Sequence, residues 1–531
     1  MTTANSKSSR QNLAKTIGRN TAFGVVSRVA QVATRLVTIP IVIAHLGLGG
    51  YGIWSIIMTT AAYMRFGSIG VKSAFQKYVA EATGNGDFEA ANKLLSTGCA
   101  VMLVLSIAGL IPIALFSGKL AKACGVPPEF IHSAGQSIAV LAIIMVLSNV
   151  GAVYEAIVMG GHRIDLTRNF STFFTVAEAV AIVAFLHYGY GLFAMACVMA
   201  TSEVGFVLSC YIASKKIMPR IQVRARLVTR TVIRELIRFA GSYQLVNILE
   251  ILYGAIIPVT VLRVFGADAA GVYAVSLRIV MSAMIGTEAL ILPILSGGAM
   301  VHASGSKEEM HVLIAKSVKV TLGLSLFPLA FIAAFGPTML LAWIGQTDSS
   351  FRVALWLICG AGFFQAFSLL GLVLYRASGK AFLDNIRQVL RIVTLLLIAI
   401  FAHKLGFYGL LGGLLLAEVI GAVFMFFALT STFQGFSLRS LFSDASRLAA
   451  ATALVMAAGG LATLIPLPTI LNSRLLAILQ VAKVLAGCAL AAWPSLWLTK
   501  SITRAESRAV LTVLLPQRRS PEHNCAESVV G

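Results

Sequence analysis

The sequence predicts an all-α polytopic membrane protein of about 14 transmembrane helices, with two six-helix repeats followed by two extra helices. Three observations predict this class: an apolar composition, long apolar stretches along the whole chain, and short motifs that recur at one offset. Of the 531 residues, 58% are hydrophobic and only 12% are charged. Soluble domains carry about 25% charged residues, so this composition excludes an ordinary soluble enzyme and a disordered chain.

Fourteen stretches are long and apolar enough to cross a bilayer as helices, which takes about 20 residues. Closed membrane barrels would instead show alternating segments of about ten residues. The first stretch follows basic residues, as in a signal peptide, but it is too long and lacks a clear cleavage site, so we expect an uncleaved span. In order, the predicted spans are about 20–45, 50–71, 94–116, 132–157, 170–187, 190–213, 236–263, 269–297, 318–343, 353–375, 388–403, 406–430, 446–467 and 475–499.

The basic residues predict the orientation of these spans. The chain has 42 Lys and Arg against 21 Asp and Glu, a formal net charge of +21. If the N-terminus is cytoplasmic, most of the basic residues fall in the two tails and the even-numbered loops, which is the positive-inside bias. We therefore predict cytoplasmic termini and no nucleic-acid partner. The odd-numbered loops hold only Lys119, Lys122, Arg263, Arg352, Lys404 and Arg474.

The same pattern divides the chain into segments. The longest basic loop separates the first six spans from the eight that follow, and it is predicted to link two lobes and to lie on anionic lipid. The predicted segments are a basic tail (1–19), an N-lobe (20–213), the basic linker (214–235), a C-lobe (236–432), two extra helices (433–499) and a second tail (500–531).

Short motifs recur between the two lobes at an offset of 218–219 residues. Six spans per repeat is an even number, so the copies would be parallel and related by an axis along the membrane normal. Alternating-access transporters are built this way, as two bundles around a central site. The matched motifs are Ile39-Pro40 with Ile257-Pro258, Tyr51-Gly52 with Ala270-Gly271, Gly86-Asp87 with Gly305-Ser306, Gly161, Asp165 and Arg168 with Gly379, Asp384 and Arg387, and Tyr190-Gly191 with Tyr408-Gly409.

Span 1 carries polar residues where they are costly, at about 2.5–3.5 kcal/mol for a charge at the bilayer centre. Arg28, Gln31 and Arg35 share one helix face, at i, i+3 and i+7. We interpret them as a cationic stripe that binds an anion, because a guanidinium group binds phosphate with two parallel hydrogen bonds. Snorkelling to the interface together with a structural ion pair is the alternative.

Span 7, the repeat partner of span 1, carries Asn247 and Glu250. Both spans have a proline at the matched position, Pro40 and Pro258, where we predict helix kinks. Interrupted helices at corresponding positions of two halves point to a binding site. Glu250 would either pair with the arginines of span 1 or act as a proton or cation coupling site, and the sequence leaves both open.

Span 8 adds two candidate residues. We group Arg278 with the anion-binding residues, and Glu288 with Asn247 and Glu250 as coupling or cavity residues. Arg391 begins span 11 and is expected at the membrane interface. Four further carboxylates lie in apolar stretches and are not ranked by the sequence: Glu155, Glu178, Glu203 and Glu418.

Motifs for catalysis or for a bound cofactor are absent from the sequence. It has neither the GxxxxGK[ST] loop of an ATP-driven motor nor the HExxH pair of a zinc site. Its external loops lack the paired carboxylates expected of a membrane glycosyltransferase. The seven cysteines form no CxxC pair. We therefore expect a protein that is not an enzyme, with no metal and no cofactor.

Several loose motifs remain: Leu46-Gly47 with Tyr51-Gly52-Ile53-Trp54, Ile69-Gly70, Tyr78-Val79-Ala80-Glu81, Gly86-Asp87, and Phe265-Gly266 with Ala270-Gly271-Val272-Tyr273. With them the chain, over about residues 15–500, resembles the polysaccharide-export flippases of the multidrug/oligosaccharidyl-lipid/polysaccharide (MOP) superfamily, of the O-antigen translocase type. The resemblance implies a V-shaped, MATE-like transporter in the cell inner membrane. It also implies transport of undecaprenyl-diphosphate-linked oligosaccharide for surface polysaccharide.

The partners that the resemblance implies are the lipid-linked oligosaccharide, membrane lipids, and the polysaccharide polymerase and chain-length machinery. A cation-coupled multidrug extruder of the same superfamily is the main alternative; it would favour acidic and aromatic cavity residues. A flippase for peptidoglycan lipid precursors differs only in substrate. A membrane-embedded glycosyltransferase is the alternative from another class.

Overall fold

The chain folds into helices, as predicted. A computed structural model describes residues 2–64, 75–76, 78–81, 85–161, 163–304, 307–377, 382–432, 438–467 and 472–501; for some of these, including 2–26, 28–29 and 235–247, it describes the backbone alone. The long helices are α1 (Thr2–Met64), α3 (Phe88–Leu115), α5 (Pro128–Gly160), α6 (Ile164–His187), α7 (Leu192–Ile217), α8 (Arg230–Ala283), α11 (Lys307–Ile344), α12 (Ser349–Ala377), α13 (Phe382–Ile400), α14 (Ala402–Thr432), α15 (Leu438–Thr463) and α16 (Ser473–Leu498). Shorter helices are α4 (Ser117–Ala123), α9 (Ile285–Ala289) and α10 (Ile291–Ser304).

Among the described residues, 11 helices are long and apolar enough to cross a membrane. This agrees with the prediction of about 14 spans, because α1 and α8 each join two predicted spans across a sharp break, at Gly47 and at Gly266. The remaining predicted span, 388–403, corresponds to α13, which is not among the 11 and carries three charged side chains. The chain is thus a multi-pass membrane protein.

The two repeats are visible in the helix packing. In the first half α1 packs on α6, and α3, α5 and α7 pack in series; in the second half α8 packs on α13, and α11, α12 and α14 pack in series. The turns repeat as well. Three pairs of glycines with positive φ, a conformation that costs glycine little, occupy matched places: Gly47 and Gly266, Gly125 and Gly345, and Gly189 and Gly406.

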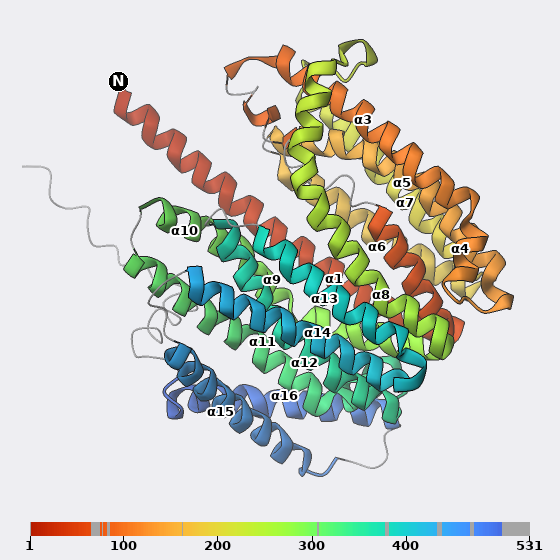
Figure 1. Cartoon of the computed structure of the whole chain (residues 1–531), viewed down its shortest axis with the longest axis vertical. Helices are drawn as coiled ribbons and strands as arrows, with labels where there is room; N and C mark the ends of the chain where they lie inside the picture. The colour runs from red at the N-terminus through yellow and green to blue at the C-terminus, as the bar shows by residue number, and fades with distance from the viewer. Residues whose placement is uncertain are drawn as a thin grey trace, which may run out of the picture.

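Figure 1 shows how these helices are arranged. We refer to α1–α7 as the N-lobe and to α8–α14 as the C-lobe. Helices α3, α5 and α7 lie together on one side, and α11, α12 and α14 on the other, with α1 and α8 between them (Figure 1). The hairpin of α15 and α16 packs against α11 and forms an outer layer beyond the C-lobe.

The largest apolar core belongs to both lobes. It includes Ile53 and Leu141 of the N-lobe together with Leu262, Val275 and Phe351 of the C-lobe, all at most 2% exposed. Its members flank the positive-φ glycines at which the chain turns. This shared core therefore lies at the end of the molecule where α1 and α8 break, which we call the kinked end.

Toward their other ends the lobes have separate cores. One contains Phe75 and Leu95 and is built from N-lobe segments and the chain that follows α7. A second contains Ile314 and Tyr375 and is built from C-lobe helices and α15. The lobes are thus held together at the kinked end, which is the arrangement of a V.

A close helix crossing fastens the kinked end. A Cβ atom at Gly52 of α1 would lie 2.5 Å from the carbonyl oxygen of Ala267 and 2.6 Å from the backbone nitrogen of Gly271, both on α8. A Cβ atom at Gly271 would in turn overlap the carbonyl oxygen of Leu48. Small residues allow membrane helices to approach this closely. Gly52 and Gly271 are also matched positions of the repeat, so the crossing has the pseudo-symmetry of the lobes.

The basic segment between the lobes is docked on α3. Asn92 of α3 donates a hydrogen bond to the carbonyl of Arg220 (3.2 Å) and accepts one from the backbone of Gln222 (2.8 Å). Ser96 in the same way donates to the Gln222 carbonyl and accepts from the backbone N–H of Arg224. The segment is therefore held along the end of the N-lobe, with the Arg220 and Arg224 side chains exposed.

Replacing Gly52 with alanine should weaken the contact between the lobes, because the added methyl group meets backbone atoms that cannot rotate away. Overpacking of this kind costs about 1–3 kcal/mol. We expect a lower midpoint of thermal unfolding for Gly52→Ala in detergent. Gly109→Ala is the matched control, since a Cβ atom there meets nothing within 4 Å; equal midpoints for the two variants would contradict the close crossing.

Candidate functional site between the lobes

The predicted site residues lie mainly on α1 and α8, the two long helices that pack against each other across the lobes. Pro40 and Pro258 lie inside helical segments of α1 and α8. The non-helical residues are Gly47 and Gly266, seven and eight positions after the prolines. The sharp changes of direction that the structure shows therefore fall at these two glycines.

Two predicted residues on α8 lie near the second half of α1. The guanidinium group of Arg278, which is half-buried, lies close enough to the hydroxyl group of buried Tyr51 to act on it electrostatically. Glu250 is exposed, and its carboxylate acts electrostatically on Tyr63, whose hydroxyl group lies against Gly254. Both Arg278 and Glu250 thus face the contact between the lobes.

Gln31 is turned toward the N-lobe interior instead. Its side-chain amide donates hydrogen bonds to Ser27 one turn away and to Ser171 of α6, each at 3.2 Å. Ser27 in turn is bonded to Thr172 at 2.6 Å. Gln31 therefore belongs to a polar network that joins α1 to α6.

The other candidates differ in burial and in how far they are described. Arg35 is exposed on α1, and Glu288 is half-buried in the short helix α9. The side chains of Arg28 and Asn247 lie outside the described part of the structure. Among the described residues, the structure therefore places two of the predicted set, Arg278 and Glu250, near the second half of α1.

A buried charged cluster in the C-lobe was not predicted from the sequence. Arg391 of α13 was expected at the interface, but it is 3% exposed and forms an ion pair with Glu418 of α14, which is 2% exposed. The guanidinium group of Arg391 also lies 3.7 Å from the ring centroid of Tyr253 of α8. The Tyr253 hydroxyl donates a hydrogen bond of 2.5 Å to Glu418. Three helices of the C-lobe are therefore joined by one cation–π contact, one ion pair and one hydrogen bond.

The cluster continues along α13. Arg391 also donates to the side chain of Gln388 (2.8 Å), and Arg387 pairs with Asp384 at 2.7 Å with both side chains buried. The cluster contains two guanidinium groups and two carboxylates, so its formal charges cancel. Charged side chains inside predicted spans were the signal for it, but the sequence does not show that α13 and α14 bring Arg391 and Glu418 together.

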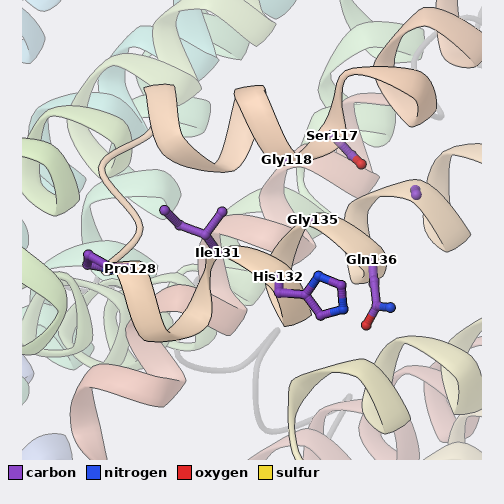
Figure 2. Close-up of a pocket in the computed structure, with 8 residues that line it drawn as sticks. Ser117, Gly118, Pro128, Ile131, His132, Gly135 and Gln136 are labelled. Atoms are coloured by element: carbon purple, nitrogen blue, oxygen red, sulfur yellow. The ribbon is translucent and has the colours of Figure 1, made fainter.

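A pocket of about 520 Å³ lies elsewhere, between α4 and α5 of the N-lobe. His132 and Gln136 project into it from successive turns of α5, and Ser117 and Gly118 line it from α4 (Figure 2). None of the predicted site residues lines this pocket.

Comparison with known proteins agrees with this architecture. The MatE family model matches residues 25–180. An inward-facing multidrug resistance MATE family transporter of the MOP superfamily aligns over 76% of this chain and 95% of its own, with a TM-score of 0.60 and 17% identity. The lipid II flippase MurJ, in an inward closed conformation, aligns over 89% of this chain and 97% of its own, with a TM-score of 0.64 and 11% identity.

The chain has the MATE-like transporter fold. A sequence relative is the uncharacterized membrane protein EpsK of Bacillus subtilis (strain 168), which is 23% identical over 331 residues. That match covers 60% of this chain and 64% of EpsK, so it spans less than two thirds of the relative.

Breaking the buried ion pair should destabilise this MATE-like fold strongly. Removing one partner of a buried pair costs about 3–5 kcal/mol because the other charge is left uncompensated. We expect Arg391→Met to lower the midpoint of thermal unfolding markedly, and Arg391→Met/Glu418→Met to recover much of the loss. The matched control is Lys93→Met, which breaks the exposed pair of Lys93 with Glu89 and should cost at most about 1 kcal/mol. A double variant no more stable than Arg391→Met would contradict the pairing.

Proposed function

We propose that this protein is a flippase that moves undecaprenyl-diphosphate-linked oligosaccharide across the inner membrane for surface polysaccharide synthesis, without catalysing a reaction. The MATE-like fold supports alternating access, in which two bundles rock about a central site. The division of cores supports it too: the lobes share a core at the kinked end and have separate cores toward their other ends. Rigid lobes joined at one end are what a rocking motion requires.

The observation that carries the proposal is a pair of arginines at matched depth. Arg35 precedes the break at Gly47 by twelve residues, and Arg278 follows the break at Gly266 by twelve. At 1.5 Å per helical residue, the Cα atom of each lies about 18 Å along its helix from the break, one on each lobe. Two guanidinium groups in this arrangement suit a diphosphate, which accepts paired hydrogen bonds from each.

The positive-inside bias supports one orientation of this structure in the membrane. With the N-terminus in the cytoplasm, the first break at Gly47 lies on the outer side of the membrane. The kinked end is then the outer end, and the ends with separate cores face the cytoplasm. In that orientation the protein would accept a lipid-linked substrate from the cytoplasmic leaflet, where its oligosaccharide is assembled. Polymerase and chain-length proteins would act on the product at the outer face.

A second candidate is a cation-coupled multidrug extruder. Glu250 favours it, because an exposed carboxylate near the half-buried ring of Tyr63 would suit a cationic drug through charge and aromatic contact. Arg278, on the part of α8 that follows the break at Gly266, disfavours a cation. The names of the similar structures include both a multidrug transporter and a flippase, so the test has to separate substrates.

The flippase proposal predicts that Arg35→Ala and Arg278→Ala each abolish surface glycan while the protein remains in the membrane at its normal level. Arg35→Lys should retain part of the activity, because an ammonium group supplies charge without two parallel donors. The measurement is surface glycan in cells whose own gene is deleted, together with the lipid-linked glycan that accumulates in the inner leaflet.

Arg352→Ala is the control, since Arg352 is exposed on the first turn of α12, outside the contact between α1 and α8. Normal surface glycan in both Arg35→Ala and Arg278→Ala would refute the diphosphate site. Unchanged glycan combined with a raised sensitivity to cationic drugs on deletion would instead favour the extruder.

A further inference from the structure

Pro40 leaves an unpaired carbonyl group in α1. A helix pairs each carbonyl with the N–H four residues later, and proline has no N–H, so the carbonyl of Leu36 lacks its usual partner. In an apolar membrane interior such a group needs another donor. The indole Nε1–H of Trp343 supplies it, with a distance of 2.6 Å to the Leu36 oxygen.

This hydrogen bond crosses from one lobe to the other. Trp343 lies in the last turn of α11 in the C-lobe and packs against the shared core, while Leu36 lies in α1 of the N-lobe. The acceptor residue, Leu36, is next to Arg35 in the sequence. The proposed function places Arg35 at the substrate. The hydrogen bond therefore couples closure of the kinked end to the position of α1, which is a proposed substrate-binding helix.

The hairpin of α15 and α16, which lies outside the repeats, binds the end of α11 that carries Trp343. Arg474, at the start of α16, donates from Nη2 to the carbonyl of Trp343 (2.8 Å) and from Nε to the carbonyl of Ala342 (3.3 Å). These are carbonyls of the last helical turn, which have no partner within the helix. A cation at this end also complements the helix dipole.

We propose that Trp343 is a positioning residue that holds α1 against the C-lobe and keeps the kinked end closed, and that Arg474 of α16 supports it. The proposal rests on the proposed function, because it takes the two lobes to alternate between two conformations. It gives the α15–α16 hairpin a role, because the hairpin fixes the end of α11 that carries the indole. Opening of the kinked end then requires the Trp343–Leu36 bond to break.

The chain contains a matched control for this bond. Pro337 removes the N–H partner of the Ala333 carbonyl in α11, and the indole of Trp356 in α12 donates to that carbonyl at 2.8 Å. The chemistry is the same as at Trp343, but both residues belong to the C-lobe. Loss of the Trp356 bond should therefore leave the distance between the lobes unchanged.

The experiment compares Trp343→Phe with Trp356→Phe in the full-length protein. Each substitution keeps an aromatic ring and removes the N–H. Spin-labelled amino acids at Lys119 and Lys404 report the kinked end, and a second pair at Glu89 and Glu308 reports the opposite ends of the lobes. All four positions are exposed. Pulsed electron resonance gives the two distance distributions.

For Trp343→Phe we expect the Lys119–Lys404 distance to lengthen and the Glu89–Glu308 distance to shorten. The open population should rise roughly 2- to 10-fold, the effect of one net hydrogen bond. Arg474→Gln should shift both distances in the same directions by less. Simple destabilisation would broaden both distributions without this opposite change.

Trp356→Phe should match the unsubstituted protein. Identical distances in Trp343→Phe and Trp356→Phe would overturn the proposal, and so would equal broadening at both ends in Trp343→Phe. If the distances shift as expected while Arg35→Ala and Arg278→Ala leave surface glycan normal, the role of Trp343 stands and the proposed substrate is wrong.

Discussion

The close approach of α1 and α8 at Gly52 and Gly271 determines the shape of the molecule. Backbone meets backbone there without side chains between, so the shared core can close around both helices at the kinked end. The positive-φ glycines at the ends of the helices turn the chain back at the same level in both lobes. Because the join is at one end, each lobe keeps its own core toward its other end.

The two lobes use different kinds of polar side chain to join their helices inside the membrane. In the N-lobe, α1 is joined to α6 by hydroxyl and amide groups, centred on Gln31 and Ser27. In the C-lobe, α8 is joined to α13 and α14 by charged groups, centred on Arg391 and Glu418. Breaking a buried ion pair costs about 3–5 kcal/mol, whereas a neutral hydrogen bond contributes a net of about 0.5–1.5 kcal/mol. The attachment of α8 within the C-lobe is therefore expected to be stiffer than that of α1 within the N-lobe.

The sequence predicted the helices and the repeat well, because these depend on local composition and on spacing along the chain. It identified Pro40 but not the partner of the freed carbonyl, since Trp343 is 307 residues away. It placed Arg391 at the interface because a charge near the start of an apolar stretch usually lies there, and its partner Glu418 is on another helix. Contacts between distant helices depend on packing angles, which periodicity does not contain.

The same limit applies to the candidate site. The faces of α1 were assigned from spacing alone, yet Gln31 is turned into the N-lobe, while Arg278 and Glu250 face the other lobe. Spacing shows which residues share a face, but only packing shows what that face meets.

A cross-link at the kinked end tests most directly whether the lobes must separate there. A Cβ atom at Gly49 would lie 3.2 Å from the Cβ atom of Ala267, close to the 3.5–4.5 Å range of disulfides. In a background without the native cysteines, Gly49→Cys/Ala267→Cys should stop translocation of lipid-linked oligosaccharide in proteoliposomes when oxidised and regain it on reduction, while each single cysteine variant stays active. Undiminished translocation by the oxidised, cross-linked protein would show that the kinked end does not open, and would contradict alternating access between these lobes.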